Sequence, residues 1–219
     1  MSQTSPPSRY RRGEEIANSI THGIGIVLAI GGLGVLTAFA SLYGDAWHIV
    51  SCSIFGAALI LLYAASPLYH AIQQPAAKSI LRILDHSAIL VLIAGTYTPI
   101  TLVNLRGPWG WTLFGVIWGL ALLGIVIEAT SLRRFRAALI VLYLIMGWAV
   151  IAAIRPMLAS IGGGGMKLLL AGGLAYTGGI IFYVWRRLPY NHAIWHLFVL
   201  AGSILHFFAI LFYVIPPAD

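Results

Sequence analysis

The sequence predicts an all-α membrane protein, a bundle of seven transmembrane helices with a cytoplasmic N-terminus and a C-terminus outside. The first observation is composition: of 219 residues, 60% are hydrophobic and 9% charged, with a mean hydropathy of +0.92. A soluble domain of this size cannot bury so much apolar surface. The second is a series of apolar runs, each about 20 residues long, which is the length that crosses a bilayer. The third is an uneven distribution of positive charge between the connectors.

The apolar runs are separated by short connectors that contain glycine, proline and charged residues, which is typical of turns. We place the seven spans near residues 16–40, 47–71, 83–103, 109–129, 136–155, 167–185 and 192–215. Residues 16–215 therefore form one bundle, with a cytoplasmic tail over 1–15 and an outer tail over 216–219. The first run resembles a signal peptide, but it is long enough to span the bilayer and carries polar residues, so we expect it to be retained.

Positive charge sets the orientation of this bundle. With the N-terminus inside, the inner face carries Arg9, Arg11, Arg12, Lys78, Arg82, Arg133, Arg134, Arg136, Arg186 and Arg187. The outer face carries Arg106, Arg155 and Lys167. The net charge of +7 is therefore explained by topology, and we expect membrane lipids rather than nucleic acid as partners.

Polar side chains that are costly in lipid gather at the cytoplasmic ends of four spans. They are Asn18 and His22 in the first span, Ser66 and His70 in the second, Asp85, His86 and Ser87 in the third, and His192 and His196 in the seventh. Ionisable residues within membrane spans are candidates for function. We therefore expect a polar site at this depth.

The spacing of the histidines indicates a metal site. His192 and His196 are four residues apart, so they share a helix face and can bind one ion from the same side. Together with His70, they make a set of three imidazoles that suits Zn²⁺ and leaves a fourth position for water. Asp85 can orient that water or accept its proton, and Ser66 lies one turn before His70 on the same face. The alternative is that these histidines are packed and hydrogen-bonded within the bundle, which for His22 alone is the favoured interpretation.

Two further histidines are expected to have other roles. His206 lies fourteen residues beyond His192, about 21 Å along a helix, so it cannot bind the same ion. We expect it to form a hydrogen bond between helices. His86 points about 100° away from Asp85 and is expected at the membrane interface.

Three other features have structural interpretations. Cys52, the only cysteine, cannot form an internal disulfide and is expected to be a small buried residue. Glu128 is expected to pair with Arg133 or Arg134 or to remain solvated. The glycine run at 162–167 lacks the Gly-Lys-Ser/Thr ending of a phosphate loop, so we expect a flexible outer connector.

The polar residues follow the order E-x-x-N-x-x-x-H, S-x-x-x-H, D and H-x-x-x-H, which resembles the haemolysin III family. That family is grouped with the progestin and adipoQ receptors and, more distantly, the alkaline ceramidases. The matching residues are Glu15, Asn18 and His22, then Ser66 and His70, then Asp85 before SAILVLIAGTYTP, then His192 and His196, with His206 ten residues further on. The resemblance extends over nearly the whole chain.

The resemblance implies a seven-helix bundle with a zinc ion near the cytoplasmic face. It implies His70, His192 and His196 as direct ligands, Asp85 acting through a bound water, Ser66 directly behind, and Asn18 and His22 as supporting residues. It also implies hydrolysis of lipid amides such as ceramides in some relatives and receptor behaviour in eukaryotic ones. The short N-terminus favours a compact protein of a cell inner membrane over a hormone receptor.

Three functions are compatible with these observations. The first is a zinc-dependent hydrolase of amide or ester bonds in lipids, with Asp85 as general base and Ser66 as support. The second is a non-enzymatic membrane protein in which zinc joins helices, and which senses membrane state or alters permeability. The third is a channel or transporter, which the clustering of polar residues at one depth disfavours. Substrate, turnover and oligomeric state are left open by the sequence.

Overall fold

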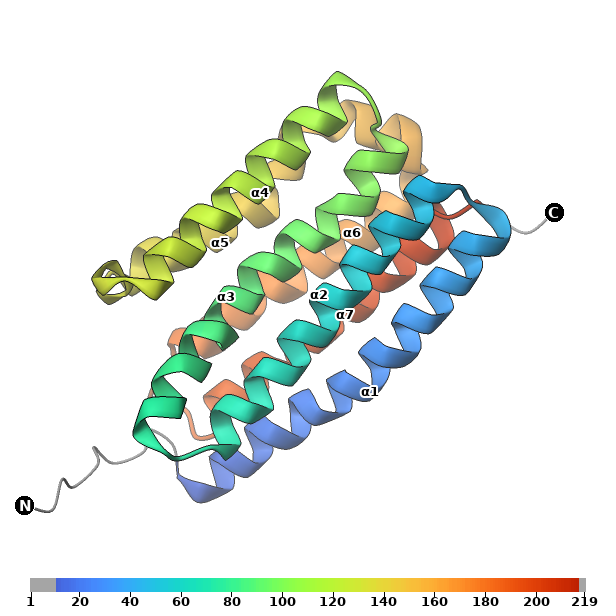
Figure 1. Cartoon of the computed structure of the whole chain (residues 1–219). Coiled ribbons are helices and arrows are strands. Elements are labelled where there is room, and N and C mark those ends of the chain that lie inside the picture. Colours follow the sequence, from blue (N-terminus) through green and yellow to red (C-terminus); the bar gives the residue numbers. More distant parts are fainter. Residues whose placement is uncertain (1–10, 217–219) are drawn as a thin grey trace, which may run out of the picture.

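The computed structural model describes residues 11–216, most of which are helical and none of which forms a β-strand (Figure 1). The predicted tails lie mostly outside this range, at residues 1–10 and 217–219. The helical segments are α1 (Arg12–Tyr43), α2 (Ala46–Ala71), α3 (Pro75–Pro99), the π-helical turn η1 (Ile100–Asn104), α4 (Pro108–Ala129), the 3₁₀ turn η2 (Ser131–Arg134), α5 (Arg136–Trp148), the 3₁₀ turn η3 (Ala149–Ala153), α6 (Ile154–Val184) and α7 (Asn191–Tyr213).

The helices form a bundle in which neighbours in sequence are mostly neighbours in space. Helix α1 packs on α2 and α7, α2 on α3, α3 on α4, and α6 on α7 (Figure 1). Helices α1 and α7 start at the same end of the bundle. A hydrogen bond from the backbone N–H of Tyr190, just before α7, to Glu14 Oε1 in the first turn of α1 joins these two starts at 3.0 Å. Helix α7 then runs to the opposite end, beside α1.

Within residues 11–216, six segments are long and apolar enough to cross a membrane. The predicted spans 136–155 and 167–185 belong to one of them, the 49-residue segment Arg136–Val184. The helix is broken in this segment at Gly162, where φ is 70° and ψ is 178°. Glycine tolerates this conformation because it has no Cβ.

The prediction of a flexible connector over 162–167 was wrong. Of these residues, Gly162 alone has non-helical angles, and 163–167 lie within α6. A single residue with positive φ is enough to redirect the chain, and the glycines that follow it keep helical hydrogen bonds within an apolar bundle.

Local sequence explains where the helices begin. The side chain of Asp45 accepts hydrogen bonds from the backbone at the start of α2. Pro75 and Pro108 stand in the first turns of α3 and α4, where a missing N–H costs nothing.

Helix α3 therefore starts eight residues before the predicted boundary at 83, because an apolar-run criterion does not detect polar helical turns that extend beyond the lipid. The early start places Lys78 on a helix rather than in a connector.

Close packing in the centre depends on glycine and on a small hydrogen-bonded group. Gly25 of α1 lies against the ring of Tyr63 of α2, and a Cβ on Gly25 would be 2.2 Å from that ring. The Tyr63 hydroxyl donates to Ser203 Oγ of α7 at 2.8 Å, and the hydroxyl of Tyr176 of α6 is 2.9 Å from the same oxygen. These contacts fix α1, α2, α6 and α7 relative to one another.

The contact between Gly25 and Tyr63 generates a matched test. We expect Gly25→Ala to destabilise the bundle by about 1–3 kcal/mol, because the added methyl group overpacks a tight contact. Gly23→Ala, two residues away with nothing within 4 Å of the added Cβ, is expected to be neutral or slightly stabilising. Thermal unfolding midpoints in detergent distinguish the two; equal midpoints would contradict this account of the packing.

Candidate metal centre

Three imidazole rings converge at one end of the bundle. His70 comes from the last turn of α2, and His192 and His196 come from the first turns of α7. Each offers one nitrogen, and these atoms lie within 4.8 Å of one another. The ring centroids are 4.5 Å apart for His192 and His196, 5.1 Å for His70 and His192, and 5.7 Å for His70 and His196. This histidine triad is buried and can hold a metal ion.

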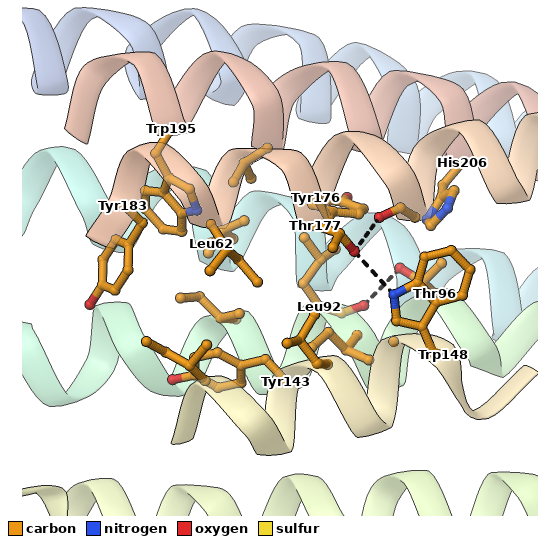
Figure 2. Close-up of a pocket in the computed structure, with 18 of the residues that line it drawn as sticks. Leu62, Leu92, Thr96, Tyr143, Trp148, Tyr176, Thr177, Tyr183, Trp195 and His206 are labelled. Atoms are coloured by element: carbon orange, nitrogen blue, oxygen red, sulfur yellow. Dashed lines mark hydrogen bonds between the residues drawn. The ribbon is translucent and has the colours of Figure 1, made fainter. Parts of the chain in front are cut away.

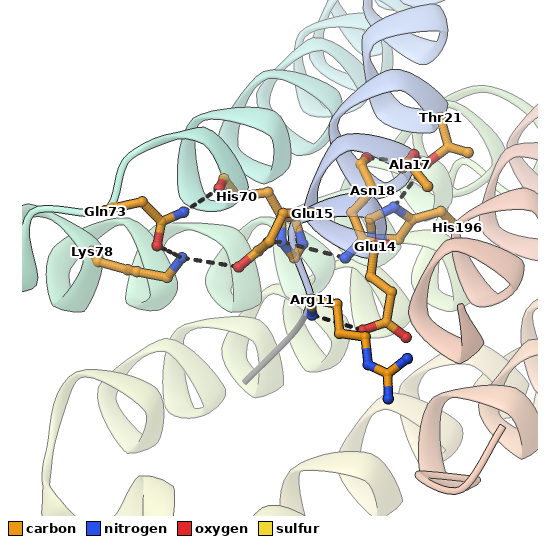
Figure 3. Close-up of polar contacts among 10 residues, drawn as sticks. All are labelled: Arg11, Glu14, Glu15, Ala17, Asn18, Thr21, His70, Gln73, Lys78 and His196. Atoms are coloured by element: carbon orange, nitrogen blue, oxygen red, sulfur yellow. Dashed lines mark hydrogen bonds and ion pairs between the residues drawn. The ribbon is translucent and has the colours of Figure 1, made fainter. Parts of the chain in front are cut away.

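Two of the three rings have a hydrogen-bonding pattern that is typical of metal-binding histidines. The Thr21 hydroxyl donates to Ala17 O at 2.9 Å, so its oxygen accepts the hydrogen of His196 Nδ1, which lies 3.0 Å away (Figure 3). A neutral imidazole with its hydrogen on Nδ1 presents a lone pair on Nε2. Within residues 11–216, His196 Nε2 has no hydrogen-bond partner. This nitrogen is therefore available to a metal.

A carboxylate holds the second ring in the same way. Glu15 Oε2 of α1 lies 2.5 Å from His70 Nδ1, and the amide nitrogen of Asn18 lies 3.4 Å from the same ring atom (Figure 3). Because a carboxylate can only accept, the hydrogen of His70 is on Nδ1, and its Nε2 faces the other imidazoles. Carboxylate–histidine pairs of this kind orient metal ligands and fix their tautomer.

Helix α3 completes this arrangement. Lys78 Nζ lies 3.3 Å from Glu15 Oε1 and 5.1 Å from the centroid of the Tyr69 ring. The lysine thus neutralises the carboxylate that orients His70, and it does so from a helical turn that the sequence placed in a connector. Positive charge at this end of the bundle therefore has a local role as well as a topological one.

The predicted supporting residues lie against the triad. His22 of α1 stacks on His196 with centroids 3.6 Å apart and an interplanar angle of 26°. It is buried, and neither of its nitrogens has a hydrogen-bond partner among the described residues. His22 packs on the face of a triad ring, whereas Asn18 contacts a ring edge.

Asp85 and Ser66 are both buried beside the triad. Asp85 lies in the third turn of α3, within interaction range of Ser66 and His70. The structure thus brings all the predicted polar residues to one end of the bundle, drawn from α1, α2, α3 and α7. The packing that achieves this is that of α1 on α2 and α7, and of α2 on α3.

The prediction for Glu128 was wrong, whereas the interfacial position expected for His86 stays a prediction. Glu128 in the last turn of α4 is 1% exposed, and its Oε1 lies 2.8 Å from His86 Nδ1 of α3. Arg133 and Arg134, its predicted partners, lie in η2, which has no buried residue. The pairing depends on which faces of α3 and α4 meet, and sequence spacing within one helix does not contain that information.

An apolar cavity of about 130 Å³ lies next to the triad, between α3, α5, α6 and α7 (Figure 2). Trp195 and Tyr183 line one end of it. The Trp195 ring is also 5.0 Å from that of His192 and 5.2 Å from that of His196. Trp195 therefore lies between the cavity and the histidine triad and contacts two of the triad rings.

His206 lies at the other end of the cavity, where its Nε2 donates to Leu169 O of α6 at 3.0 Å (Figure 2). The predicted hydrogen bond between helices is therefore confirmed.

Comparison with known proteins agrees with this architecture. The family described as "Haemolysin-III related" matches residues 10–207. The chain belongs to the haemolysin III family. It is 52% identical to "Hemolysin-3" of Bacillus cereus over 206 residues, covering 94% of each chain. It is also 52% identical to the "Hemolysin-3 homolog" of Bacillus subtilis (strain 168) over 200 residues, covering 91% of this chain and 94% of that relative.

A more distant relative of this chain is human. The "Monocyte to macrophage differentiation factor" of Homo sapiens is 30% identical over 207 residues, covering 90% of this chain and 83% of the relative. The resemblance drawn from the polar motifs is therefore confirmed.

Sequence reasoning missed two contacts that orient the triad. Glu15 entered only as part of the family motif, although its spacing to Asn18 and His22 places all three on one face of α1. That face could have indicated a partner for a ligand histidine. Thr21 gave no such signal, because a threonine in an apolar helix usually bonds to its own backbone.

The contact between Glu15 and His70 generates a second test. We expect Glu15→Gln to weaken the binding of added Zn²⁺ by about 10–100-fold, because it removes the charge that orients a ligand imidazole. Glu14→Gln is the matched control, since Glu14 bonds to Arg11 and Tyr190 backbone atoms and not to the triad. Competition with a metal chelator measures both affinities, and equal values would disprove the orienting role.

Proposed function

We propose that this haemolysin III protein is a zinc-dependent hydrolase of amide or ester bonds in lipids, located in a cell inner membrane. The observation that carries the proposal is the position of the histidine triad. Residues of α1 hold the Nδ1 atoms of His70 and His196. Trp195, which contacts two rings of the triad, lines an apolar cavity. A metal site beside an apolar cavity suits a substrate with a polar linkage and an acyl chain.

The donor set fits zinc. Imidazole nitrogens suit Zn²⁺, and catalytic zinc sites typically have three protein ligands and one open position. His70, His192 and His196 would hold the ion, each through one ring nitrogen. When bound, zinc would polarise a carbonyl group and make water a nucleophile near neutral pH.

The remaining steps fall to the protein's own side chains. Asp85 would take the proton that the attacking water loses at the carbonyl carbon. It would then deliver this proton to the nitrogen or oxygen of the leaving group as the C–N or C–O bond breaks. Ser66 is buried near Asp85 and would help to hold its carboxyl group in place. The cavity would hold the acyl chain, because its wall is almost entirely apolar.

One observation favours the non-enzymatic alternative. The contacts around the triad join α1, α2, α3 and α7, so a bound metal would also stabilise the bundle. In that case the same residues would support folding rather than turnover. The names of the bacterial relatives refer to haemolysis and not to hydrolysis.

Metal content and turnover together test the proposal. We expect the purified chain to contain zinc and to hydrolyse ceramide-like lipids, and His192→Ala/His196→Ala to lose both. His48→Ala, which removes an imidazole at the far end of α2, is the control. Asp85→Asn is expected to retain zinc and lose about 10²–10⁴-fold in rate. Zinc-dependent stability without hydrolysis of any lipid tried would instead support the structural alternative.

We also propose seven membrane passes, with the N-terminal end cytoplasmic. The segment Arg136–Val184 is about 74 Å long if fully helical, more than twice the thickness of a hydrocarbon core. The break at Gly162 divides it into two lengths that can each cross once. Because α1 and α7 start at the same end and run side by side, the number of passes from α1 to α7 is odd.

Cysteine labelling tests this topology in a Cys52→Ser background. We expect a membrane-impermeant thiol reagent added outside intact cells to label Ser160→Cys and to leave Arg134→Cys and Arg186→Cys unlabelled. Residues 160 and 186 lie on either side of the final pass of the segment Arg136–Val184. Equal protection of Ser160→Cys and Arg186→Cys would contradict two crossings by that segment.

A further inference from the structure

The end of the cavity next to the triad is lined by polar and aromatic side chains, which are His86, Tyr143, Tyr183 and Trp195. We call it the triad end. The hydroxyl groups of Tyr143 and Tyr183 lie there, at the opposite end from His206 (Figure 2). A ligand with its apolar chain in the cavity would therefore have its polar group at the triad end.

Arg82 lies on the side of α3 that faces the cavity. The residues of α3 that line the cavity are His86, Ile89, Leu92, Ile93, Thr96 and Tyr97. At about 100° per residue they cover one side of the helix, and Arg82 falls in the middle of that side, one turn before His86. Long side chains on a helix point back toward its N-terminus. The guanidinium group of Arg82 is therefore placed just beyond the triad end of the cavity.

Arg136 has the same relation to the cavity on α5. The residues of α5 that line the cavity are Ile140, Tyr143, Leu144, Gly147 and Trp148. Arg136 lies one turn before Ile140, within the same side of the helix. Helix α5 starts at the same end of the bundle as α3, because Glu128 in the last turn of α4 contacts His86 and the short turn η2 leads into α5. Two of the helices that enclose the cavity thus carry an arginine just beyond its triad end.

These two positive charges have no acidic partner in the described part of the chain. Neither Arg82 nor Arg136 takes part in an ion pair within residues 11–216. Arg82 Nε is buried and has no hydrogen-bond partner in that range. A buried donor on a charged group is costly without an acceptor. Among the residues that line the cavity, none is an aspartate or a glutamate, so an anion at this end would meet no carboxylate in the wall.

We propose that Arg82 and Arg136 bind the phosphate headgroup of a lipid whose acyl chain lies in the cavity. The three terminal oxygens of a phosphate monoester can accept hydrogen bonds from two guanidinium groups at once. One guanidinium group already occupies both oxygens of a carboxylate, so a phosphate is favoured over the carboxylate of a fatty acid.

This inference deepens the proposed function and rests on it only for the position of the cleaved bond. Asp85 directly precedes His86, so an amide or ester bond near Asp85 would lie between the phosphate and the acyl chain. Binding of the headgroup requires the two arginines and the cavity, and it requires neither metal nor turnover. Absence of hydrolysis with every lipid would overturn the proposed function and leave this inference standing.

Ligands that share one acyl chain provide the test in the wild-type chain. They are lysophosphatidic acid, monoacylglycerol and the free fatty acid, with inorganic phosphate as the headgroup alone. The ligand concentration that gives half of the maximal rise in the thermal unfolding midpoint, in detergent, measures affinity. We expect lysophosphatidic acid to bind at least about tenfold more tightly than the others, on the scale of one charge-assisted hydrogen bond. Equal affinity for monoacylglycerol or the fatty acid would overturn the inference, and equal affinity for inorganic phosphate would overturn its assignment to a lipid.

Two double variants assign the preference to these arginines. We expect Arg82→Gln/Arg136→Gln to reduce the affinity for lysophosphatidic acid to that for monoacylglycerol. Arg133→Gln/Arg134→Gln removes the same charge from η2, which contributes no residue to the cavity wall, and is expected to change the affinity by less than about twofold because of screening. An equal loss in both would show general attraction by surface charge and would refute the proposal.

A pair of single variants keeps the test decisive if the first double variant fails to fold. Arg136 and Arg134 are both exposed, so neither substitution disturbs a buried contact. We expect Arg136→Gln to weaken the binding of lysophosphatidic acid several-fold and Arg134→Gln to leave it unchanged. Equal affinities in these two variants would contradict the proposed site.

Discussion

The contacts of α1 with the Nδ1 atoms of His70 and His196 are the interaction on which the candidate metal centre depends. An imidazole buried in an apolar bundle needs a partner for its N–H, because water cannot reach it. Glu15 and Thr21 provide these partners, so each ring turns its other nitrogen toward the centre of the triad. The ligand geometry is therefore set by a helix that contributes no triad residue.

This dependence makes the ends of four helices a single structural unit. Lys78 of α3 contacts the carboxylate that holds His70 of α2, and His22 of α1 stacks on His196 of α7. The close approach of α1 to α2 at Gly25 and Tyr63 keeps these groups within reach, and Tyr63 in turn bonds to Ser203 of α7. Packing in the centre of the bundle and orientation of the ligands at its end are thus coupled.

The cavity extends this unit toward the opposite side of the bundle. Trp195 contacts two of the triad rings and lines the cavity, while His206 lies eleven residues further along the same helix. Helix α7 therefore carries two histidines of the triad, the Trp195 ring that contacts both the triad and the cavity, and His206 at the cavity's far end. Such an arrangement suits a ligand with a polar group near the triad and an apolar chain in the cavity.

The sequence by itself determined the membrane class, the approximate spans, the family and the histidines of the candidate site. The membrane class and the spans follow from apolar run length, and the histidine pair of α7 from i, i+4 spacing, which are properties of one helix at a time. The family follows from the resemblance of the polar motifs, in their order along the chain. Only the tertiary structure decided that Glu15 and Thr21 orient the triad, that Glu128 pairs with His86, and that residues 163–167 are helical. Each of these depends on which faces of separate helices meet, and side-chain packing between distant segments sets those faces.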